Sequence, residues 1–450
     1  MDKFDLILSG GMVVSGEGQR KADVGIKDGK IQIVAEDLSQ HVATERIDIH
    51  GRFLLPGIID VHVHPVYTDD IEYSSYVAAF GGTTTLLHFI YARPGQDLLP
   101  VMEQAIEEAT RTSRLDFGLH CGLFEAPKQV SQIKDVLKLG VRSFKFFMTY
   151  LKQGWYTDDY QLIKAMDILA ENGGLPMVHA ENGGGIDYLE DKYLTGPHAS
   201  WKNFNISRPA VLEEEAIFRA ICLAEVTGCP LYIPHVTAER ALRPIRAARE
   251  RGQVVYGETC AHYLSLTEKI LEERGALAKV GPPIRTENDR QALWQALGDR
   301  TLQVVASDHA AKLKDPQGDF IQQGFGSPQL ETLFPVTFDE GVNQDRISLS
   351  RLVQVMCENP ARIFGLYPQK GVIRQGSDAD LVVLNPEKVF TIRAENQHSH
   401  VGYTLYEGRT VKGWPEMTFQ RGRKVLDHDQ VVASPGTGKF LPVSPSGEFI

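Results

Sequence analysis

Residues 53–65, FLLPGIIDVHVHP, form an apolar run that ends in two histidines. This run is the first of about eight strand-like segments that alternate with helical patterns along the chain. Segments that stay apolar along their whole length are typical of strands buried on both faces of a parallel sheet. The other seven segments are residues 83–90, 115–121, 142–147, 175–179, 231–235, 253–257 and 302–306. Helices are predicted between them at residues 97–113, 131–139, 157–172, 211–227, 238–251 and 287–297.

The alternation of strands and helices predicts an α/β fold, and the number of strands predicts a closed (β/α)8 TIM barrel with its helices outside. We assign the barrel to residues 56–364. Residues 1–55 and 365–450 contain short strand-like runs instead, with a hairpin signal at Asp28-Gly29. We therefore expect one small β-sandwich domain built from both chain termini. The tail after Val432 is rich in proline, glycine and serine, which predicts an extended arm or poor order.

The composition is that of a globular protein: of 450 residues, 42% are hydrophobic and 23% are charged. The net charge of −11 counts against a nucleic-acid partner, which would require a basic surface. The five cysteines are too few and too scattered for a disulfide framework. Neither a targeting segment nor an apolar run of membrane-spanning length is visible. We therefore expect a cytoplasmic protein with reduced thiols that binds no membrane.

Two histidines close the first apolar run. His62 and His64 are two residues apart, so in a strand their side chains share one face and can share one metal ion. Taken alone, this pair is as consistent with structural histidines as with a metal site. However, metal-ligand or charged side chains also lie near the ends of four further segments, and the C-terminal ends of barrel strands are where active sites are built. These residues are Lys145, His179, His235 and Asp308. Their coincidence favours a metal centre.

Lys145 lies inside an aromatic strand, Phe144 to Phe147, where an unpaired lysine should almost never be fully buried. One interpretation is that its ammonium reaches the barrel mouth as an ordinary cation. The other is that burial lowers its pKa, so that the neutral amine reacts with carbon dioxide. The resulting carbamate would be an anion able to bridge two metal ions. The sequence leaves both interpretations open.

Motifs spread over nearly the whole chain resemble the cyclic-amidase branch of the amidohydrolase superfamily, which contains D-hydantoinase, dihydropyrimidinase, allantoinase and dihydroorotase. They include PGIIDVHVH at 56–64, GGTT at 81–84, SFKFFMTY at 143–150, VHAEN at 178–182, HVT at 235–237, GETCAHYL at 257–264, PPIR at 282–285, SDH at 307–309, NPARIFGLYP at 359–368 and GSDADL at 376–381. The motifs at 145–150 and 359–381 most resemble hydantoinase and dihydropyrimidinase. The resemblance implies a metal-dependent hydrolase that opens a cyclic ureide or imide, within a homotetramer.

The resemblance also implies the roles of the site residues. His62 and His64 would bind one metal ion, a carboxylated Lys145 would bridge two, and His179 and His235 would bind the second. In the same way, Asp308 would bind the first metal and act as general base towards a metal-bridging hydroxide that attacks the carbonyl carbon. Tyr150 would donate a hydrogen bond to the developing oxyanion. Mixed imidazole and carboxylate ligands suit zinc, and they admit manganese or iron.

Substrate recognition departs from the family pattern. The serine that usually precedes Pro-Pro is Gly281, which can still bind substrate through its backbone, and the usual Pro-Asn-Gly stretch is replaced in residues 322–326. At the end of the second strand, where the family commonly has an aspartate, this chain has His88, which would either line the pocket or lie behind it. We expect Trp155 to line the pocket for the exocyclic substituent.

Allantoinase or dihydroorotase activity is the alternative function, and the latter would need a carboxylate-binding arginine, for which Arg93 is a candidate. A non-catalytic relative that forms structural tetramers is a further alternative. Such relatives typically lack metal ligands, whereas every ligand position is filled here.

Overall fold

The computed structural model describes residues 3–443. Its centre is an eight-stranded sheet whose strands follow one another in chain order, β8 to β15. Every neighbouring pair in this sheet is parallel. A parallel bridge between Val63 and His309 joins the two ends of the sheet, so the expected (β/α)8 barrel is confirmed. The strands are β8 Ile58–Val63, β9 Thr83–Ala92, β10 Asp116–Leu123, β11 Ser143–Phe147, β12 Leu175–His179, β13 Leu231–Ile233, β14 Val255–Cys260 and β15 Val304–Ala306.

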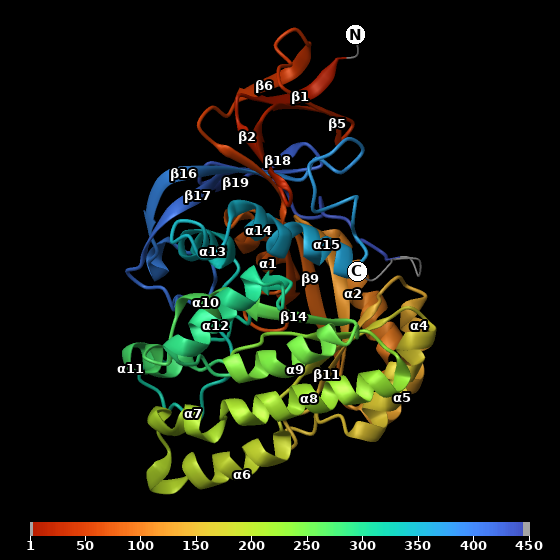
Figure 1. The fold of residues 1–450 in the computed structure, drawn as a ribbon, viewed down its shortest axis with the longest axis vertical. Helices are drawn as coiled ribbons and strands as arrows, with labels where there is room; N and C mark the ends of the chain where they lie inside the picture. The colour runs from red at the N-terminus through yellow and green to blue at the C-terminus, as the bar shows by residue number, and fades with distance from the viewer. Residues whose placement is uncertain (1–2, 444–450) are drawn as a thin grey trace.

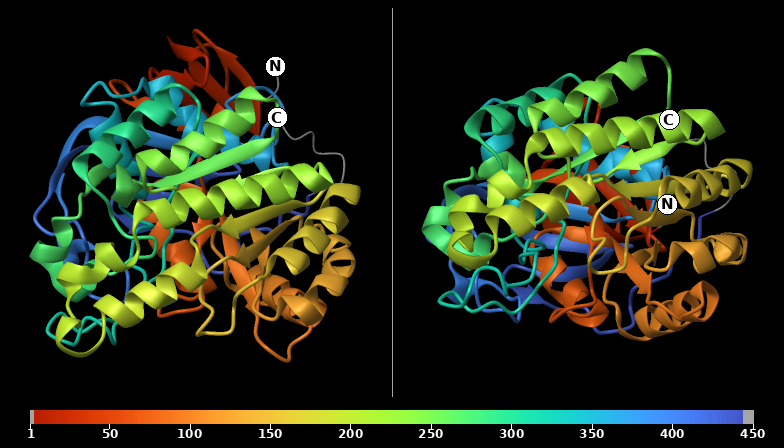
Figure 2. Two further views of the ribbon diagram at one scale, coloured as in Figure 1. Left: turned by 60° about the horizontal axis from the view of Figure 1, so that its bottom comes forward. Right: turned by 90° about the horizontal axis from the view of Figure 1, so that it is seen from below.

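Helices surround the barrel strands (Figure 2). Those expected from the sequence are α2 Leu98–Thr112, α4 Ile133–Leu137, α5 Asp159–Glu171, α8 Ala210–Thr227, α9 Glu239–Glu250 and α12 Glu287–Gly298. Asp158 caps α5 by accepting a hydrogen bond from the Gln161 N–H. The N-cap residue of α9 is Ala238, which has no polar side chain, so this helix lacks a side-chain cap. The hydroxyl of the preceding Thr237 donates to Glu213. The sequence did not predict α1 Ile71–Phe80, α6 Gly183–Tyr193 or α13 Leu333–Gly341.

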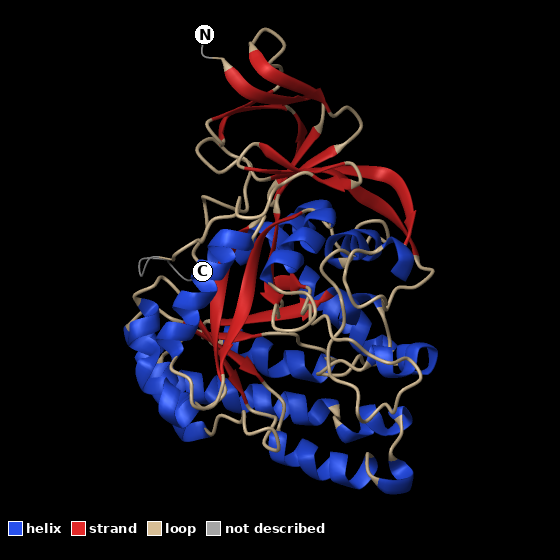
Figure 3. Cartoon of the chain, turned by 180° about the vertical axis from the view of Figure 1, so that it is seen from behind, coloured by secondary structure: helices blue, strands red, loops and turns tan. Residues whose placement is uncertain are grey.

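Strands from both chain termini form two further sheets, which lie together at the top of Figure 1 and in Figure 3. One has the order β5-β4-β1-β6 and the other the order β19-β18-β17-β16-β7-β2-β3. Their strands are β1 Phe4–Ser9, β2 Met12–Ser15, β3 Gly18–Lys21, β4 Asp23–Lys27, β5 Lys30–Ala35, β6 Ala43–Asp48, β7 Phe53–Pro56, β16 Leu381–Thr391, β17 Thr410–Gln420, β18 Arg423–Asp427 and β19 Gln430–Val431. A shared hydrophobic core joins N-terminal residues such as Leu6 to C-terminal residues such as Phe419. The shared strand order and the shared core support our proposal that residues 1–55 and 365–450 form one domain.

The C-terminal arm begins after Val432. Its backbone pairs with the barrel strand β10: the Phe117 N–H donates to Lys439 and the Leu441 N–H donates to Phe117, at 2.9 and 2.8 Å. Up to residue 443 the tail is therefore an extended arm that packs on the barrel, and residues 444–450 lie outside the described part. No helix within residues 3–443 is long and apolar enough to cross a membrane.

Candidate active site

The site lies at the C-terminal ends of the barrel strands. His62 lies in β8 and His64 follows it, Lys145 lies in β11, and His179 is the last residue of β12. His235 and Asp308 each come two residues after a strand, β13 and β15. All of these residues except the fully buried His62 line one cavity of about 340 Å³. Tyr150, Trp155 and Gly281 line the same cavity.

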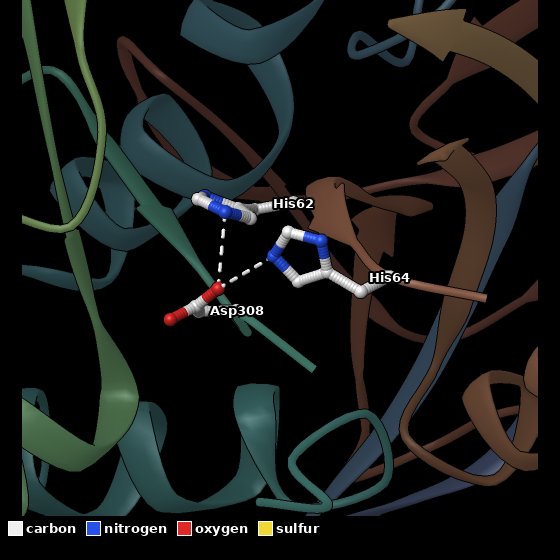
Figure 4. A group of neighbouring side chains, drawn as sticks. All are labelled: His62, His64 and Asp308. Atoms are coloured by element: carbon white, nitrogen blue, oxygen red, sulfur yellow. Dashed lines mark hydrogen bonds and ion pairs between the residues drawn. The ribbon is translucent and has the colours of Figure 1, made fainter. Parts of the chain in front are cut away.

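His62, His64 and Asp308 converge on one point (Figure 4). Asp308 Oδ1 lies 3.0 Å from His64 Nε2 and 3.0 Å from His62 Nε2. The second contact lacks hydrogen-bond geometry, so the buried His62 Nε2 has no hydrogen-bond partner among the described residues. One carboxylate and two imidazoles that face a common point fit a divalent metal ion such as zinc.

Glu258 holds His62 from behind. Its carboxylate is fully buried and lies 2.6 Å from His62 Nδ1, and it also accepts hydrogen bonds from the Tyr232 hydroxyl at 2.7 Å and the His235 N–H at 3.1 Å. Burial disfavours a charged imidazole, but Glu258 and Asp308 outweigh this and raise the pKa of His62 to about 9. A carboxylate that is hydrogen-bonded to the ring nitrogen not used for metal binding fixes the orientation of the imidazole and increases its basicity.

Lys145, His179 and His235 form the other side of the site. Lys145 Nζ lies 3.4 Å from His235 Nε2 and 5.0 Å from the centre of the Phe89 ring. Burial lowers the pKa of Lys145 to about 8, which increases the neutral fraction that carboxylation requires. The imidazole rings of His179 and His235 are 4.5 Å apart, centre to centre. These side chains therefore lie close enough to share bound metal ions.

Glu181, which is paired with Arg208, supports His179 as Glu258 supports His62. His179 Nε2 lies 2.7 Å from Glu181 Oε2, and Glu181 is held in turn by the buried Arg208 guanidinium. Arg208 and His179 outweigh the effect of burial and hold the pKa of Glu181 well below its ordinary value. The negative charge on Glu181 leaves His179 Nδ1 as the nitrogen available to a metal ion.

Three site residues have left-handed backbone conformations that are uncommon for residues other than glycine. The φ angles are +65° at Tyr150, +43° at His235 and +51° at Asp308. Such conformations cost free energy and persist only where the surrounding structure imposes them. Their coincidence at strand ends shows that the loops aim these side chains into the cavity at the expense of local stability.

A second acidic cluster does not fit a metal ion. Asp116, Asp378 and Asp380 also bring carboxylate oxygens together. The ammonium of Lys370 already fills the space between them, at 2.9 Å from Asp378 and 2.6 Å from Asp380, and it also pairs with Asp116. This buried cluster therefore serves to join β10 to the terminal strands.

Of the residues expected to contact the substrate, some line the cavity and others do not. The Trp155 ring stacks on Phe124 at 4.3 Å, centre to centre, and forms part of the cavity wall. A β-carbon on Gly281 would lie 3.0 Å from the Phe325 ring, so the absence of a side chain at 281 leaves room for that ring. His88 does not line the cavity: it is fully buried, and neither of its nitrogens has a hydrogen-bond partner among the described residues. Arg93 is exposed and is likewise absent from the lining.

Sequence reasoning missed several residues of the site. Glu258 had a usable signal, because it is a carboxylate in the otherwise apolar strand β14. Arg208 and two lysines of the cavity wall, Lys279 and Lys312, had no such signal, because they lie in connecting segments outside the barrel strands. Only the folded chain brings these three residues to the site.

Comparison with known proteins agrees with this geometry. The model of the amidohydrolase family matches residues 53–425, so the chain belongs to that family. It is 38% identical to a D-hydantoinase from Ralstonia pickettii, with 97% of this chain and 98% of that protein aligned. It is 33% identical to an L-hydantoinase from Paenarthrobacter aurescens, with coverage of 97% and 98%. The crystal structure of a dihydropyrimidinase from Brevibacillus agri has a TM-score of 0.93 and 34% identity, with 98% of each chain covered.

Proposed function

We propose that this protein is a metal-dependent hydrolase that opens the amide bond of a cyclic ureide or imide of the hydantoin or dihydropyrimidine type. The observation that carries the proposal is the convergence of His62, His64 and Asp308 on one point. Lys145, His179 and His235 complete the proposed ligand set for two divalent metal ions. The full-length similarity to hydantoinases of both stereochemical classes supports the substrate class.

The bound metal ions, zinc by preference, would supply a nucleophile at neutral pH and polarise the substrate carbonyl. Lys145, carboxylated by carbon dioxide, would act as an anionic ligand to both. His62 and His64 outweigh the effect of burial and hold the pKa of Asp308 well below its ordinary value, so this carboxylate is ionised. Asp308 would take a proton from the attacking water and return it to the ring nitrogen as the C–N bond breaks.

Tyr150 is the proposed oxyanion donor. Burial raises the pKa of its phenol, which keeps the hydroxyl protonated and able to donate a hydrogen bond. Its ring lies 5.3 Å from that of His179, and the left-handed backbone at Tyr150 directs it into the cavity. Gly281 and Trp155 would contact the ring and its substituent. His88, buried behind the cavity, has no place in this proposal.

The test is ring-opening activity of the protein supplied with zinc or manganese and bicarbonate. The substrates are dihydrouracil, hydantoin, phenylhydantoin, allantoin and dihydroorotate. Activity on dihydrouracil or a hydantoin supports the proposal. Activity confined to allantoin or dihydroorotate would establish the alternative function, and inactivity on all five with two metals bound would overturn the proposed substrate class. The homotetramer and the cytoplasmic location stay predictions. A measurement of the molecular mass in solution tests the homotetramer.

A further inference from the structure

Three lysines gather on one wall of the cavity, in segments that the proposed mechanism does not use. Lys279 and Lys312 line the cavity, and Lys314 lies beside them. We call Lys279, Lys312 and Lys314 the lysine cluster. Within residues 3–443, none of the three forms an ion pair with a carboxylate. Three neighbouring cations without a counter-ion are costly, because burial penalises each charge and the charges repel one another.

Lys279 is the most buried member of the cluster, with only 5% of the residue exposed. Its ammonium donates to the backbone carbonyls of Phe320 at 3.0 Å and Ile321 at 2.9 Å. An ammonium has three N–H donors, so one is left without a partner among the described residues. Burial lowers the pKa of Lys279 to about 8, although Glu190 and Asp319 oppose this from beyond ion-pair distance. The ammonium is therefore placed to bind an anion at low desolvation cost.

The other two lysines complete the wall. Lys314 Nζ donates to the carbonyls of Leu277 and Lys279, at 3.1 and 2.9 Å, and burial with the two neighbouring lysines lowers its pKa strongly. Lys312 Nζ lies 4.3 Å above the ring of Tyr67, which also lines the cavity. A β-carbon at Gly324 would lie 2.7 Å from Lys312 Cδ, so the glycine leaves space for this lysine. Lys312 is half-buried and within reach of a ligand.

Lys279 and the proposed oxyanion donor Tyr150 lie beside the same aromatic ring, that of Phe325. The Phe325 ring is 5.0 Å from Lys279 Nζ and 6.3 Å from the centre of the Tyr150 ring. The ring that is opened must reach the metal ligands at the strand ends, whereas the lysines lie in connecting segments of the cavity wall. This arrangement favours an anion carried on a side chain of the substrate ring over one attached directly to the ring.

On the basis of the proposed function, we infer that the substrate is a cyclic ureide with a carboxylate on its exocyclic substituent, and that Lys279 and Lys312 bind this carboxylate. An anion beside the cluster would neutralise the buried charge that the protein leaves unpaired. A hydrogen bond between charged groups typically changes affinity by about 10- to 100-fold. The cluster would thus select anionic substrates mainly through binding.

The test compares two substrates of the same shape. One is hydantoin with a 2-carboxyethyl group at position 5, and the other has the neutral carboxamide in place of the carboxylate. We expect the metal-loaded enzyme to show a kcat/KM for the carboxylate about 10- to 100-fold higher than for the carboxamide, mostly through KM. The preference should shrink at high salt, because ions screen the attraction. In Lys312→Met the ratio should fall towards one, and in Lys312→Arg most of it should return.

Lys152→Met is the matched control. Lys152 is an exposed lysine near the cavity loop that pairs with Asp191 at 2.6 Å, so its removal changes the net charge equally but should leave the substrate ratio unchanged. A wild-type ratio near one would overturn the inference. So would a ratio that survives both Lys312→Met and Lys279→Gln. Dihydroorotate compared with dihydrouracil tests a carboxylate attached to the ring itself, and a preference confined to that pair would refute the side-chain position.

A binding experiment separates this inference from the proposed function. Calorimetry measures binding of N-carbamoylglutamate and N-carbamoylglutamine, the ring-opened forms of the two test hydantoins. Tighter binding of the first compound that is lost in Lys312→Met supports the lysine cluster even if no ring-opening activity is found. Equal binding of both compounds by an enzyme that does open hydantoins leaves the proposed function intact and overturns the anion site.

Discussion

Glu258→Gln tests how the metal-binding histidines are held. The Glu258 carboxylate lies 2.6 Å from His62 Nδ1 and accepts two further hydrogen bonds in a fully buried position. Glutamine fills the same space but is neutral, so His62 loses its charged partner. Hydrogen bonds to charged groups contribute about 1.5–3 kcal/mol. Since about 1.4 kcal/mol is a factor of ten, zinc affinity should fall roughly 10- to 150-fold.

This range overlaps the loss of about 10- to 100-fold typical when the carboxylate partner of a metal-binding histidine is removed. The assay is competition for zinc against a chromophoric chelator, with metal content measured by mass spectrometry. Tyr232→Phe removes only a neutral donor to the same carboxylate and should weaken zinc binding by about 2- to 10-fold.

Asp116→Asn is the control for buried carboxylates in general. Asp116 pairs with Lys370 and is the first residue of β10, whereas the proposed metal ligands lie at the C-terminal ends of the barrel strands. Its loss should therefore lower thermal stability without changing zinc affinity. The reasoning is refuted if Glu258→Gln binds zinc as tightly as the wild type. It is also refuted if Asp116→Asn weakens zinc binding to the same extent.

Further predictions concern the remaining site residues. Lys145→Ala should lose metal and activity together, with partial rescue by a short carboxylic acid, and full activity would exclude a bridging role. Because burial lowers the pKa of Lys145 to about 8, the neutral amine increases about tenfold per pH unit below 8. At a fixed concentration of dissolved ¹³CO₂, the initial rate of carbamate formation by the metal-free protein, followed by NMR, should therefore rise roughly tenfold from pH 6 to 7, and a flat profile would contradict this. Tyr150→Phe should lower kcat by about 10²–10³-fold at unchanged metal content, and an unchanged kcat would exclude it as oxyanion donor. Trp155→Ala should lower kcat/KM for bulky hydantoins by roughly 3- to 10-fold relative to hydantoin itself, whereas equal effects on both would show that it does not contact the substituent.

The barrel could be predicted because its signals are local. Buried strands stay apolar along their length, and amphipathic helices such as α2 and α5 show their periodicity directly in the sequence. The helix α1 escaped prediction because seven of its residues are buried, including both serines, so it has no single apolar stripe. The spacing of His62 and His64 indicated a shared face for the same local reason.

Long-range contacts decided the rest. The apolar run at 53–65 is divided at Gly57, where a β-carbon would collide with Thr84, so β7 joins a terminal sheet while β8 enters the barrel. The pairing of β7 with β16 has no signature in the chain near these residues. The carboxylate of Glu258 stands out in strand β14, but nothing near it in the chain identifies His62 as its partner.

By itself, the sequence determined the alternation of strands and helices and the side chains offered at the strand ends, because backbone periodicity and burial act over a few residues. Only the tertiary structure decided which side chains meet. Lys279 and Lys312 reach the cavity wall, and Arg208 reaches the Phe325 ring that lines it, through segments whose paths depend on packing between distant parts of the chain. In our proposal, selection among substrates depends on those contacts, whereas the reaction class depends on the side chains at the strand ends.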